Sequence, residues 1–290
     1  MALPPRPWPT GWCEQLEPLV RRVLAPNGSP FTYTGTQTYF VGGAEGLAVI
    51  DPGPDVPEHL AALEAAIVGA PVLAICCTHT HRDHSPAAAP LAARTGAPVV
   101  GCAPLVLESA EPRADAPFDP DYRPDRVLAD NDRIEGPGWT LTAVATPGHT
   151  SNHLCYALEE SGALVTGDHV MGWSTTVVAP PDGDMAAYMA SLARLQARND
   201  RIYYPAHGPA VERPKQLVRG MIGHRRQRER QILRLLGSGP HAIGELVPVM
   251  YKGIATHLWA AAGQSVKAHL IDLERRGRVA RSGQRWTILT

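Results

Sequence analysis

The chain has 290 residues and a net charge of −1, and its 44% hydrophobic and 19% charged residues indicate a globular rather than a disordered protein. No apolar run approaches the ~18 residues of a membrane helix, and the proline-rich start of the chain lacks the apolar stretch of a secretory signal. The five cysteines are scattered without a Cys-x-x-Cys pair, so we expect reduced thiols in a cytoplasmic protein without a membrane partner.

Runs rich in β-branched and aromatic residues between turn signals predict the strands of the first two thirds of the chain. These predicted strands are 31–34, 36–41, 47–50, 72–77, 98–101, 126–129, 139–145, 154–158, 163–166 and 201–205. Apolar residues at helical spacing predict helices over 56–68, 87–95 and 185–198. The alternation of strands and helices predicts an α/β body. Residues 111–125, rich in Pro, Asp and Arg, are typical of an exposed loop.

A different pattern fills the C-terminal part of the chain. A long basic helix is predicted over 215–236, and Gly237-Ser238-Gly239-Pro240 ends it. Further helices are predicted over 241–250, 255–262 and 264–276, followed by a hairpin over 278–288. Three helices and a β-ribbon predict a winged helix. The expected domains are a catalytic body over 1–212, a linking helix over 213–237 and a winged-helix-like domain over 238–290.

The charges divide at the same boundary. Residues 1–212 hold 12 Lys and Arg against 24 Asp and Glu, a net charge of −12, whereas residues 213–290 hold 15 against 4, a net charge of +11. The asymmetry predicts an acidic body that attracts metal ions and a basic appendage that suits a polyanion. Solvated helices rich in arginine are the alternative explanation of the basic part.

The most distinctive motif directly follows the buried strand over 72–77. Thr78-His79-Thr80-His81-Arg82-Asp83-His84 places three imidazoles and a carboxylate in one loop. A rigid strand that ends in a cluster of ligands is a way to build a metal site, and imidazole with carboxylate suits zinc, iron or manganese. Three further strand ends carry His149, Asp168 and His207. We expect these separate strand ends to converge on one rim, where neighbouring glycines let the backbone approach.

This set of residues, in this order, resembles the metallo-β-lactamase fold superfamily over about residues 30–212. The resemblance implies a four-layer αββα sandwich with a two-metal site at its edge, here joined to a C-terminal winged helix. It implies that the first metal ion is held by His79, His81 and His149. The second is then held by Asp83, His84 and His207, with Asp168 as the bridge between the two.

The resemblance also implies that Asp51 supports the histidine loop from outside the ligand set; the alternative is that Asp51 only caps the turn at Pro52-Gly53. Two divalent cations roughly 3.5–4 Å apart acidify a bridging water and neutralise charge on the attacked group. Asp83 and His207 are the catalytic candidates, with Asp83 able to accept a proton. Zinc is the expected metal, and manganese or iron are alternatives.

Within the superfamily, segments 24–39 and 167–177 and the winged helix are similar to the beta-lactamase-like protein 2 subfamily. Animal members of that subfamily are endoribonucleases that prefer single strands, so the resemblance implies hydrolysis of single-stranded RNA. The basic C-terminal part supports this hypothesis because phosphates bind to clustered cations. The candidate phosphate contacts are Arg225, Arg226, Arg228 and Arg230.

The same ligands serve other reactions, because the superfamily includes several kinds of enzyme. The second hypothesis is a hydrolase of a small thioester or ester, similar to the glyoxalase II group, in which the basic tail only packs or mediates homo-oligomer formation. Weak hydrolysis of β-lactams is a further alternative. A scaffold protein with structural metals is the non-enzymatic hypothesis, and the complete ligand set argues against it.

Overall fold

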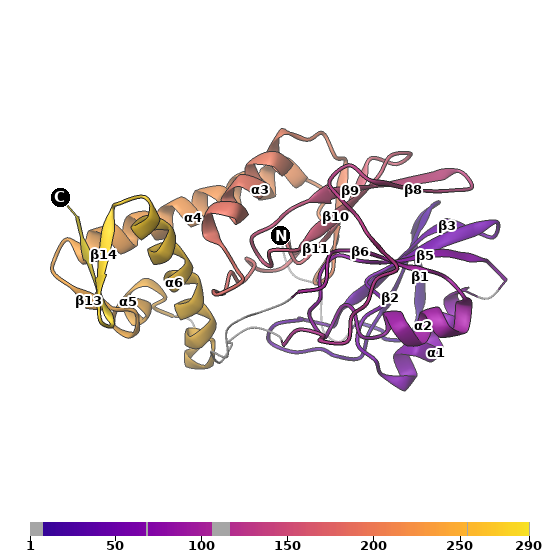
Figure 1. Ribbon diagram of the computed structural model, residues 1–290, viewed down its shortest axis with the longest axis horizontal. Helices are drawn as coiled ribbons and strands as arrows, with labels where there is room; N and C mark the ends of the chain where they lie inside the picture. The colour runs from indigo at the N-terminus through magenta and orange to yellow at the C-terminus, as the bar shows by residue number, and fades with distance from the viewer. Residues whose placement is uncertain (1–7, 68, 106–116, 254, 290) are drawn as a thin grey trace.

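The computed structural model describes residues 8–67, 69–105, 117–253 and 255–289, and its two largest sheets face each other (Figure 1). The first sheet has seven strands in the order β1-β2-β3-β4-β5-β6-β7. They are β1 (Cys13–Glu17), β2 (Val20–Leu24), β3 (Gln37–Gly43), β4 (Gly46–Ile50), β5 (Val72–Cys77), β6 (Val99–Gly101) and β7 (Arg126–Val127). Strands β1 to β4 pair antiparallel and β4 to β7 pair parallel.

The second sheet has five strands in the order β12-β11-β10-β9-β8. They are β8 (Arg133–Gly136), β9 (Trp139–Ala145), β10 (Leu154–Leu158), β11 (Ala163–Gly167) and β12 (Ile202–Pro205). One hydrophobic core joins the facing sides of the two sheets, with Phe40 and Ile75 from the first and Leu141 and Tyr156 from the second. Burying these apolar side chains is the main favourable contribution to the fold.

Helices cover the outer faces of both sheets. Helices α1 (Pro57–Ile67) and α2 (Ala88–Thr95) contact strands of the first sheet. Helices α3 (Met185–Ala197) and α4 (Pro214–Leu236) pack on each other and share a core with the second sheet. The predicted αββα sandwich is therefore confirmed. Among the described residues, no helix combines the length and the apolar composition needed to cross a membrane.

The N-terminal strands were not predicted. The structure pairs β1 with β2 and β2 with β3, so the sheet begins well before the first predicted strand. The predicted strand over 31–34 is wrong, because this segment is a turn in which Tyr33 has a φ of 60°. Strand β8 was also missed. Residue 68 of the first predicted helix and residues 111–116 of the predicted loop lie outside the described residues.

The C-terminal domain differs from the predicted three helices in one place. Helix α5 (Ile243–Met250) is followed by the 3-10 turn η1 (Thr256–Leu258), which continues directly into α6 (Trp259–Arg275). The predicted break at Gly263 is wrong, because this glycine lies inside α6, where Ile243 and Val247 of α5 come close to it. A Cβ at this position would make ordinary van der Waals contacts with both residues, so Gly263 lies at the contact between α5 and α6 without a glycine being required there.

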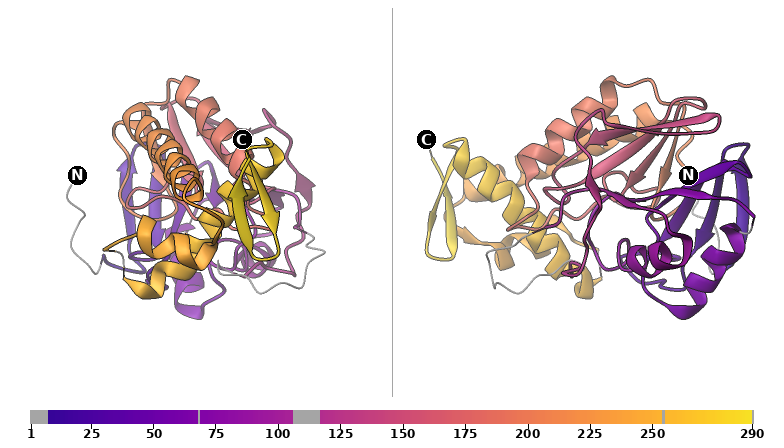
Figure 2. Two further views of the ribbon diagram at one scale, coloured as in Figure 1. Left: turned by 90° about the vertical axis from the view of Figure 1, so that its left-hand side faces the viewer. Right: turned by 45° about the vertical axis from the view of Figure 1, so that its right-hand side comes forward.

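A small sheet completes this domain, with the order β13-β15-β14. Its strands are β13 (His241–Ala242), β14 (Val279–Ser282) and β15 (Arg285–Ile288), and β14 and β15 form the predicted hairpin. Ile232 and Leu236 of α4 belong to the core of this domain, so α4 spans the catalytic body and the winged helix instead of only linking them. Figure 2 shows the C-terminal domain projecting beyond the two sheets on the side of α3 and α4.

A buried histidine on α6 makes the stability of the protein dependent on pH. His269 is 2% exposed, and neither ring nitrogen has a hydrogen-bond partner among the described residues. Burial, assisted by Arg225 and His224, lowers its pKa to about 3. The unfolded chain therefore binds one more proton between a pH of about 6.5 and 3, and wild-type stability falls as the pH falls through this range.

The free energy of unfolding of the variant His269→Leu is expected to exceed that of the wild type by ~1 kcal/mol or more at pH 7, because two unsatisfied buried nitrogens are removed. The difference is expected to grow by about 2 kcal/mol at pH 5, where only the wild type takes up the extra proton on unfolding. Urea unfolding at both pH values measures this. His257→Leu, at an exposed position on η1, is the control. Equal pH dependence of wild type and His269→Leu would contradict the prediction.

Candidate metal centre

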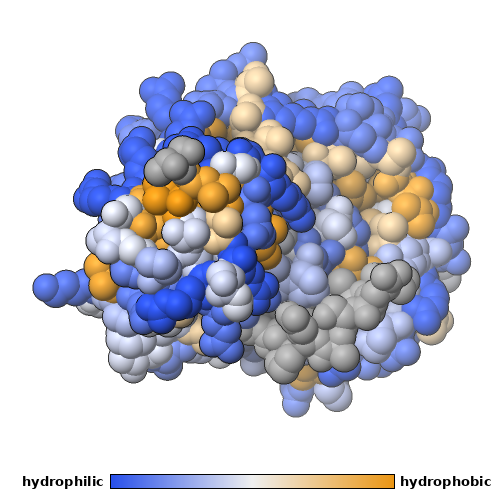
Figure 3. Space-filling model, turned by 60° about the vertical axis from the view of Figure 1, so that its left-hand side comes forward, coloured by the Kyte–Doolittle hydropathy of each residue, from blue (hydrophilic) through white to orange (hydrophobic). Residues whose placement is uncertain are grey.

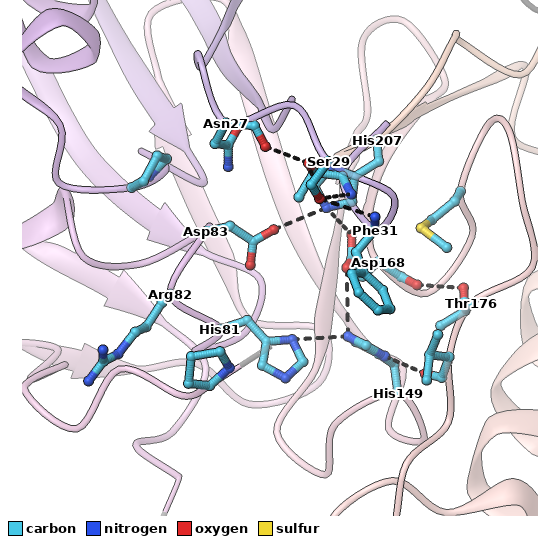
Figure 4. A pocket seen from close by; sticks show the side chains of 15 residues that line it. Asn27, Ser29, Phe31, His81, Arg82, Asp83, His149, Asp168, Thr176 and His207 are labelled. Carbon is cyan, nitrogen blue, oxygen red and sulfur yellow. Dashed lines mark hydrogen bonds and ion pairs between the residues drawn. The ribbon is translucent and has the colours of Figure 1, made fainter. Parts of the chain in front are cut away.

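The seven predicted ligands lie together at one edge of the sandwich, each in a loop that follows a strand. Four of them follow β5, and the others follow β9, β11 and β12. Figure 4 shows His81, Asp83, His149, Asp168 and His207 around the same pocket. The structure divides the set into a first group, made of His79, His81, His149 and Asp168, and a second group, made of Asp83, His84 and His207. Ligand atoms within each group lie within 4.8 Å of one another.

Nitrogen atoms of three imidazoles converge in the first group. His81 Nδ1 lies 2.9 Å from His79 Nε2 and 3.2 Å from His149 Nε2. In the second group, Asp83 Oδ2 lies 3.4 Å from His84 Nε2 and 3.3 Å from His207 Nε2. Donor atoms of a tetrahedral zinc site with bonds of ~2.0–2.1 Å lie roughly 3.3 Å apart. Both groups therefore have the spacing that one such ion requires.

Asp168 lies between the two groups. Its Oδ2 is 3.7 Å from His149 Nε2 in the first group, and its Oδ1 is 3.2 Å from His207 Nε2 and 3.6 Å from His84 Nε2 in the second. Among the described residues, Asp168 Oδ1 and His84 Nε2 are buried and, apart from these ion-pair contacts, have no hydrogen-bond partner. Buried polar atoms without partners are costly, and divalent cations at the two groups would satisfy them.

Backbone carbonyls fix the proton positions of two of the histidines. His149 Nδ1 lies 2.7 Å from the carbonyl oxygen of Val177, and His207 Nδ1 lies 3.3 Å from that of Gly35. A carbonyl only accepts, so each Nδ1 carries a proton, and in the neutral ring Nε2 is the atom that offers its lone pair to the site. The neutral tautomer that binds a metal is thus set by the loops around the centre.

Asp51 and Thr78 fix the proton positions of two histidines in the loop that follows β5. Asp51 accepts hydrogen bonds from the Thr78 backbone at 2.7 Å, the Thr78 hydroxyl at 2.7 Å and His84 Nδ1 at 2.9 Å. Because the Thr78 hydroxyl donates to Asp51, its oxygen accepts from His79 Nδ1 at 3.0 Å. Asp51 thereby holds two ligand histidines in the metal-binding tautomer. It does so from a left-handed backbone conformation with a φ of 50°, which an aspartate tolerates better than most residues.

Proton affinities in the metal-free centre follow from burial and from the facing charges. Burial and the neighbouring imidazoles of His84 and His81 lower the pKa of His79 well below its ordinary value. At His207, burial is outweighed by Asp168 and Asp83, whose carboxylates raise its pKa to about 10. Burial of Asp83 is outweighed by His84 and His207, which hold its pKa well below the ordinary range. Ion binding at the second group therefore has to release protons.

Three residues outside the predicted ligand set support the centre. Thr78 stands inside the metal motif, and its hydroxyl at the strand end was the available signal. His153 Nε2 accepts a hydrogen bond from the backbone N–H of Asp168 at 3.2 Å and so positions the bridging residue. Gln37 donates from its side chain to the carbonyl oxygens of Pro205 at 3.0 Å and Gly208 at 2.6 Å, on either side of His207. The last two contacts join residues that only the fold brings together.

A glycine beside His149 allows two loops to meet. Gly148 has a φ of 135°, and a Cβ built on it would lie 2.3 Å from Tyr188 Cα. The variant Gly148→Ala is expected to lower the free energy of unfolding by ~2–4 kcal/mol, the combined cost of overpacking and backbone strain, and to weaken metal binding because His149 moves. Thermal unfolding and metal content measure these effects.

The control for this prediction is Gly239→Ala. Gly239 has a φ of 133° but has open space where a Cβ would stand, so it shares the backbone strain without the collision. Equal destabilisation of the two variants would show that the contact with Tyr188 does not matter.

The four candidate phosphate contacts on α4 have different surroundings. Arg225 is 2% exposed and donates a hydrogen bond to the carbonyl oxygen of Thr176, so its prediction as a surface phosphate contact is wrong. Arg228 is half-buried, donates to Gln231 at 2.9 Å and lies 4.4 Å from the ring of Tyr251.

Arg226 and Arg230 are exposed one turn apart on α4 and border a shallow pocket that they share with Glu229, Asp272 and Arg276. In that pocket Arg276 pairs with Glu229 at 2.7 Å and with Asp272 at 2.9 Å. The charges around the two exposed arginines are therefore mixed. Figure 3 shows the molecule with the left-hand side of Figure 1 brought forward, where hydrophilic residues cover most of the surface and the hydrophobic ones form separate patches.

An open pocket of about 490 Å³ leads to the ligands. Asp83, Asp168 and His207 form its polar floor, and Phe31, Pro54, Pro117, Met171 and Val177 contribute to its walls (Figure 4). Most of the exposed lining surface is apolar, although further polar residues, among them Asn27, Ser29 and Arg82, also line the pocket. This arrangement is typical of a site for a small organic molecule.

Comparisons with known proteins give a consistent result. Residues 32–207 match the family model described as the metallo-beta-lactamase superfamily, and residues 242–286 match that of a beta-lactamase associated winged helix domain. A beta-lactamase-like protein 2 homolog of Drosophila melanogaster is 33% identical over 90% of this chain and 89% of the relative. An atrochrysone carboxyl ACP thioesterase of Aspergillus fumigatus is 35% identical over 76% of this chain and 66% of the relative.

A solved metallo-beta-lactamase family protein from Thermus thermophilus superposes with a TM-score of 0.76 at 24% identity, and the match covers 95% of this chain and 100% of that one. At this level of identity the likeness concerns the fold. It includes the C-terminal part, since nearly all of both chains is matched.

Proposed function

The chain belongs to the metallo-beta-lactamase superfamily and is a metal-dependent hydrolase, and we propose that its substrate is a thioester. The observation that carries this proposal is the apolar wall beside the ligand cluster, formed by Phe31, Met171 and Val177. A thioester brings an apolar acyl group and one carbonyl that must be polarised, and the pocket offers a surface for each. Relatives at 30–35% identity that are named acyl carrier protein thioesterases support the same substrate class.

The centre fits two divalent metal ions, and members of this superfamily bind such ions. We propose zinc, because imidazole nitrogens dominate both ligand groups and zinc accepts imidazole and carboxylate together. When bound, the ions would polarise the carbonyl oxygen and make water nucleophilic near neutral pH. The histidine nitrogens already point into the centre, so little reorganisation accompanies binding.

The residues of the chain then position the reactants. The apolar wall holds the acyl group, and Asp83, which lines the pocket floor and is only partly covered, accepts a proton from the attacking water. The water oxygen bonds to the carbonyl carbon, the carbon–sulfur bond breaks, and the leaving thiolate takes up a proton. The products are a carboxylic acid, ionised at neutral pH, and a thiol. Thr36 Oγ1 donates to Asp83 Oδ2 at 3.4 Å and helps to orient the base.

Hydrolysis of single-stranded RNA is the second candidate. The specific observation that favours it is the net charge of +11 over residues 213–290 together with the exposed side chains of Arg226 and Arg230. In this case the backbone phosphates would bind along α4 and the scissile phosphate at the metal ligands. We also propose a reducing cytoplasmic location, which suits the five unpaired cysteines. Weak hydrolysis of β-lactams and formation of homo-oligomers are further proposals.

One panel distinguishes these substrates. Zinc-loaded protein is assayed against an octanoyl thioester, a single-stranded RNA and a β-lactam, and the thioester is expected to have the highest kcat/KM. RNA affinity is measured at several salt concentrations for the wild type and for Arg226→Ala with Arg230→Ala. A thioester activity no greater than that of metal-free protein overturns the proposal. A salt slope reduced by ~2 in the double variant, with RNA cleavage, favours the second candidate.

A further inference from the structure

A second pocket, of about 310 Å³, lies between the catalytic body and the C-terminal domain, and we refer to it as the interdomain pocket. The catalytic body contributes residues 30–31 and part of the loop over 171–177 to its lining, together with residues of α4. The winged-helix region contributes residues 251, 258, 261, 262 and 265. Phe31, Met171, Thr176 and Val177 line this pocket and the metal pocket alike. The two spaces therefore adjoin at these four residues. Figure 4 shows Phe31 and Thr176 where they line the metal pocket.

The interdomain pocket has apolar residues from both domains, the polar residues Ser174, Thr175, Thr176 and Ser265, and two titratable residues from α4. Leu258, Ala261 and Ala262 of the winged-helix region and Phe31 and Met171 of the catalytic body are apolar lining residues, whereas α4 contributes His224 and Arg225. His224 Nδ1 has no hydrogen-bond partner among the described residues, and burial lowers the pKa of this histidine to about 4. At neutral pH the positive charge in the pocket is that of Arg225.

Arg225 is a buried cation without a carboxylate partner among the described residues. It is 2% exposed, it donates to the Thr176 carbonyl oxygen, and its guanidinium carbon lies 5.2 Å from the centre of the Tyr188 ring. Its Nε makes no hydrogen bond among the described residues. A carbonyl dipole and a ring face compensate only part of the cost of burying a charge. An anionic group of a ligand would supply the missing compensation.

We infer that the interdomain pocket binds the distal part of the acyl group of the substrate, and that this part is an apolar chain or ring that ends in an anionic oxygen bound by Arg225. The inference rests on the proposed thioester hydrolysis and specifies its substrate. The thioester carbonyl lies at the metal ligands, the acyl group crosses the boundary formed by Phe31 and Val177, and its acidic end meets the guanidinium. The winged-helix domain is thereby a wall of the substrate site.

Binding of two fatty-acid probes to metal-free protein tests this inference without hydrolysis. Octanoate and octanamide are titrated calorimetrically into chelator-treated protein, so that metal ions cannot bind the carboxylate. Octanoate is expected to bind at least ~10-fold more tightly, since a charge-assisted hydrogen bond replaces a neutral one. Arg225→Met is expected to abolish the difference between the probes, and Arg226→Met, the exposed neighbour, to preserve it.

A second variant covers the case in which Arg225→Met fails to fold. Ala262→Trp fills the interdomain pocket from α6, away from the metal ligands, and is expected to weaken binding of both probes by at least ~10-fold. Equal affinity of octanoate and octanamide for the wild type overturns the anionic end, and unchanged binding in Ala262→Trp overturns the pocket. Octanoate binding that depends on Arg225, without hydrolysis of any thioester by zinc-loaded protein, would refute the proposed reaction and leave the binding site standing.

Discussion

The variant Asp168→Asn is expected to lose at least ~10²–10³-fold in kcat/KM, the cost of removing one preorganised charged group from a reacting centre. One carboxylate oxygen faces His149 at 3.7 Å and the other faces His207 at 3.2 Å, so the residue serves both ligand groups. Asparagine has the same shape but no charge, and its amide nitrogen cannot bind a cation. Bound zinc is expected to fall from two ions per chain to one or fewer.

Metal analysis after gel filtration in limiting zinc measures the content, and initial rates with the thioester measure the activity. Asp121→Asn, an exposed substitution of the same kind, is the control and is expected to change neither quantity. Wild-type zinc content in Asp168→Asn would mean that this residue is not a ligand. Loss of activity with both ions retained would assign it to substrate binding instead.

The metal centre could be predicted because each ligand stands directly after a strand. A strand end has a fixed place in the sheet, so His149, Asp168 and His207 converge once the sandwich forms. Contacts between loops could not be predicted from the sequence, because they depend on how two loops meet in the folded protein. His149 finds the carbonyl oxygen of Val177 across a sequence separation of 28 residues, and nothing in the local pattern around either residue indicates this pairing.

The burial of Arg225 could have been predicted from the helical periodicity of α4, but the charge count alone does not show it. Val218, Met221, Ile222 and Ile232 are buried on α4, at the three- and four-residue spacing of one helix face. Arg225 falls on this stripe between Ile222 and Ile232, and the exposed Arg226 does not. Helical periodicity therefore separates the two arginines, whereas composition treats them alike. The partner of the buried charge still requires the tertiary structure.

The variant Asp51→Asn is expected to weaken metal binding by ~10–100-fold, the range typical of a lost partner behind a ligand histidine. Asparagine tolerates the left-handed conformation that Asp51 adopts, with a φ of 50°, so the backbone is expected to remain in place. Asp55→Asn, four residues along the same loop and exposed, is the control. Competition with a chelator of known affinity measures the change, and an unchanged affinity would contradict the supporting role of Asp51.

The physical reason is the direction of the hydrogen bonds. Asp51 Oδ2 accepts from the Thr78 hydroxyl and from His84 Nδ1, but an amide nitrogen in its place donates. His84 then has to accept at Nδ1, which moves its proton to Nε2, the atom that faces Asp83 and Asp168. A protonated nitrogen cannot bind a cation, so the second group loses a ligand without any side chain leaving its position. Burial of His84 is outweighed by Asp83, Asp168 and Asp51, which raise its pKa well above the ordinary value in the metal-free protein. Imidazole ¹⁵N shifts of His84 are therefore recorded at alkaline pH, where the ring is neutral. They then report this tautomer directly and separate it from a general loss of structure.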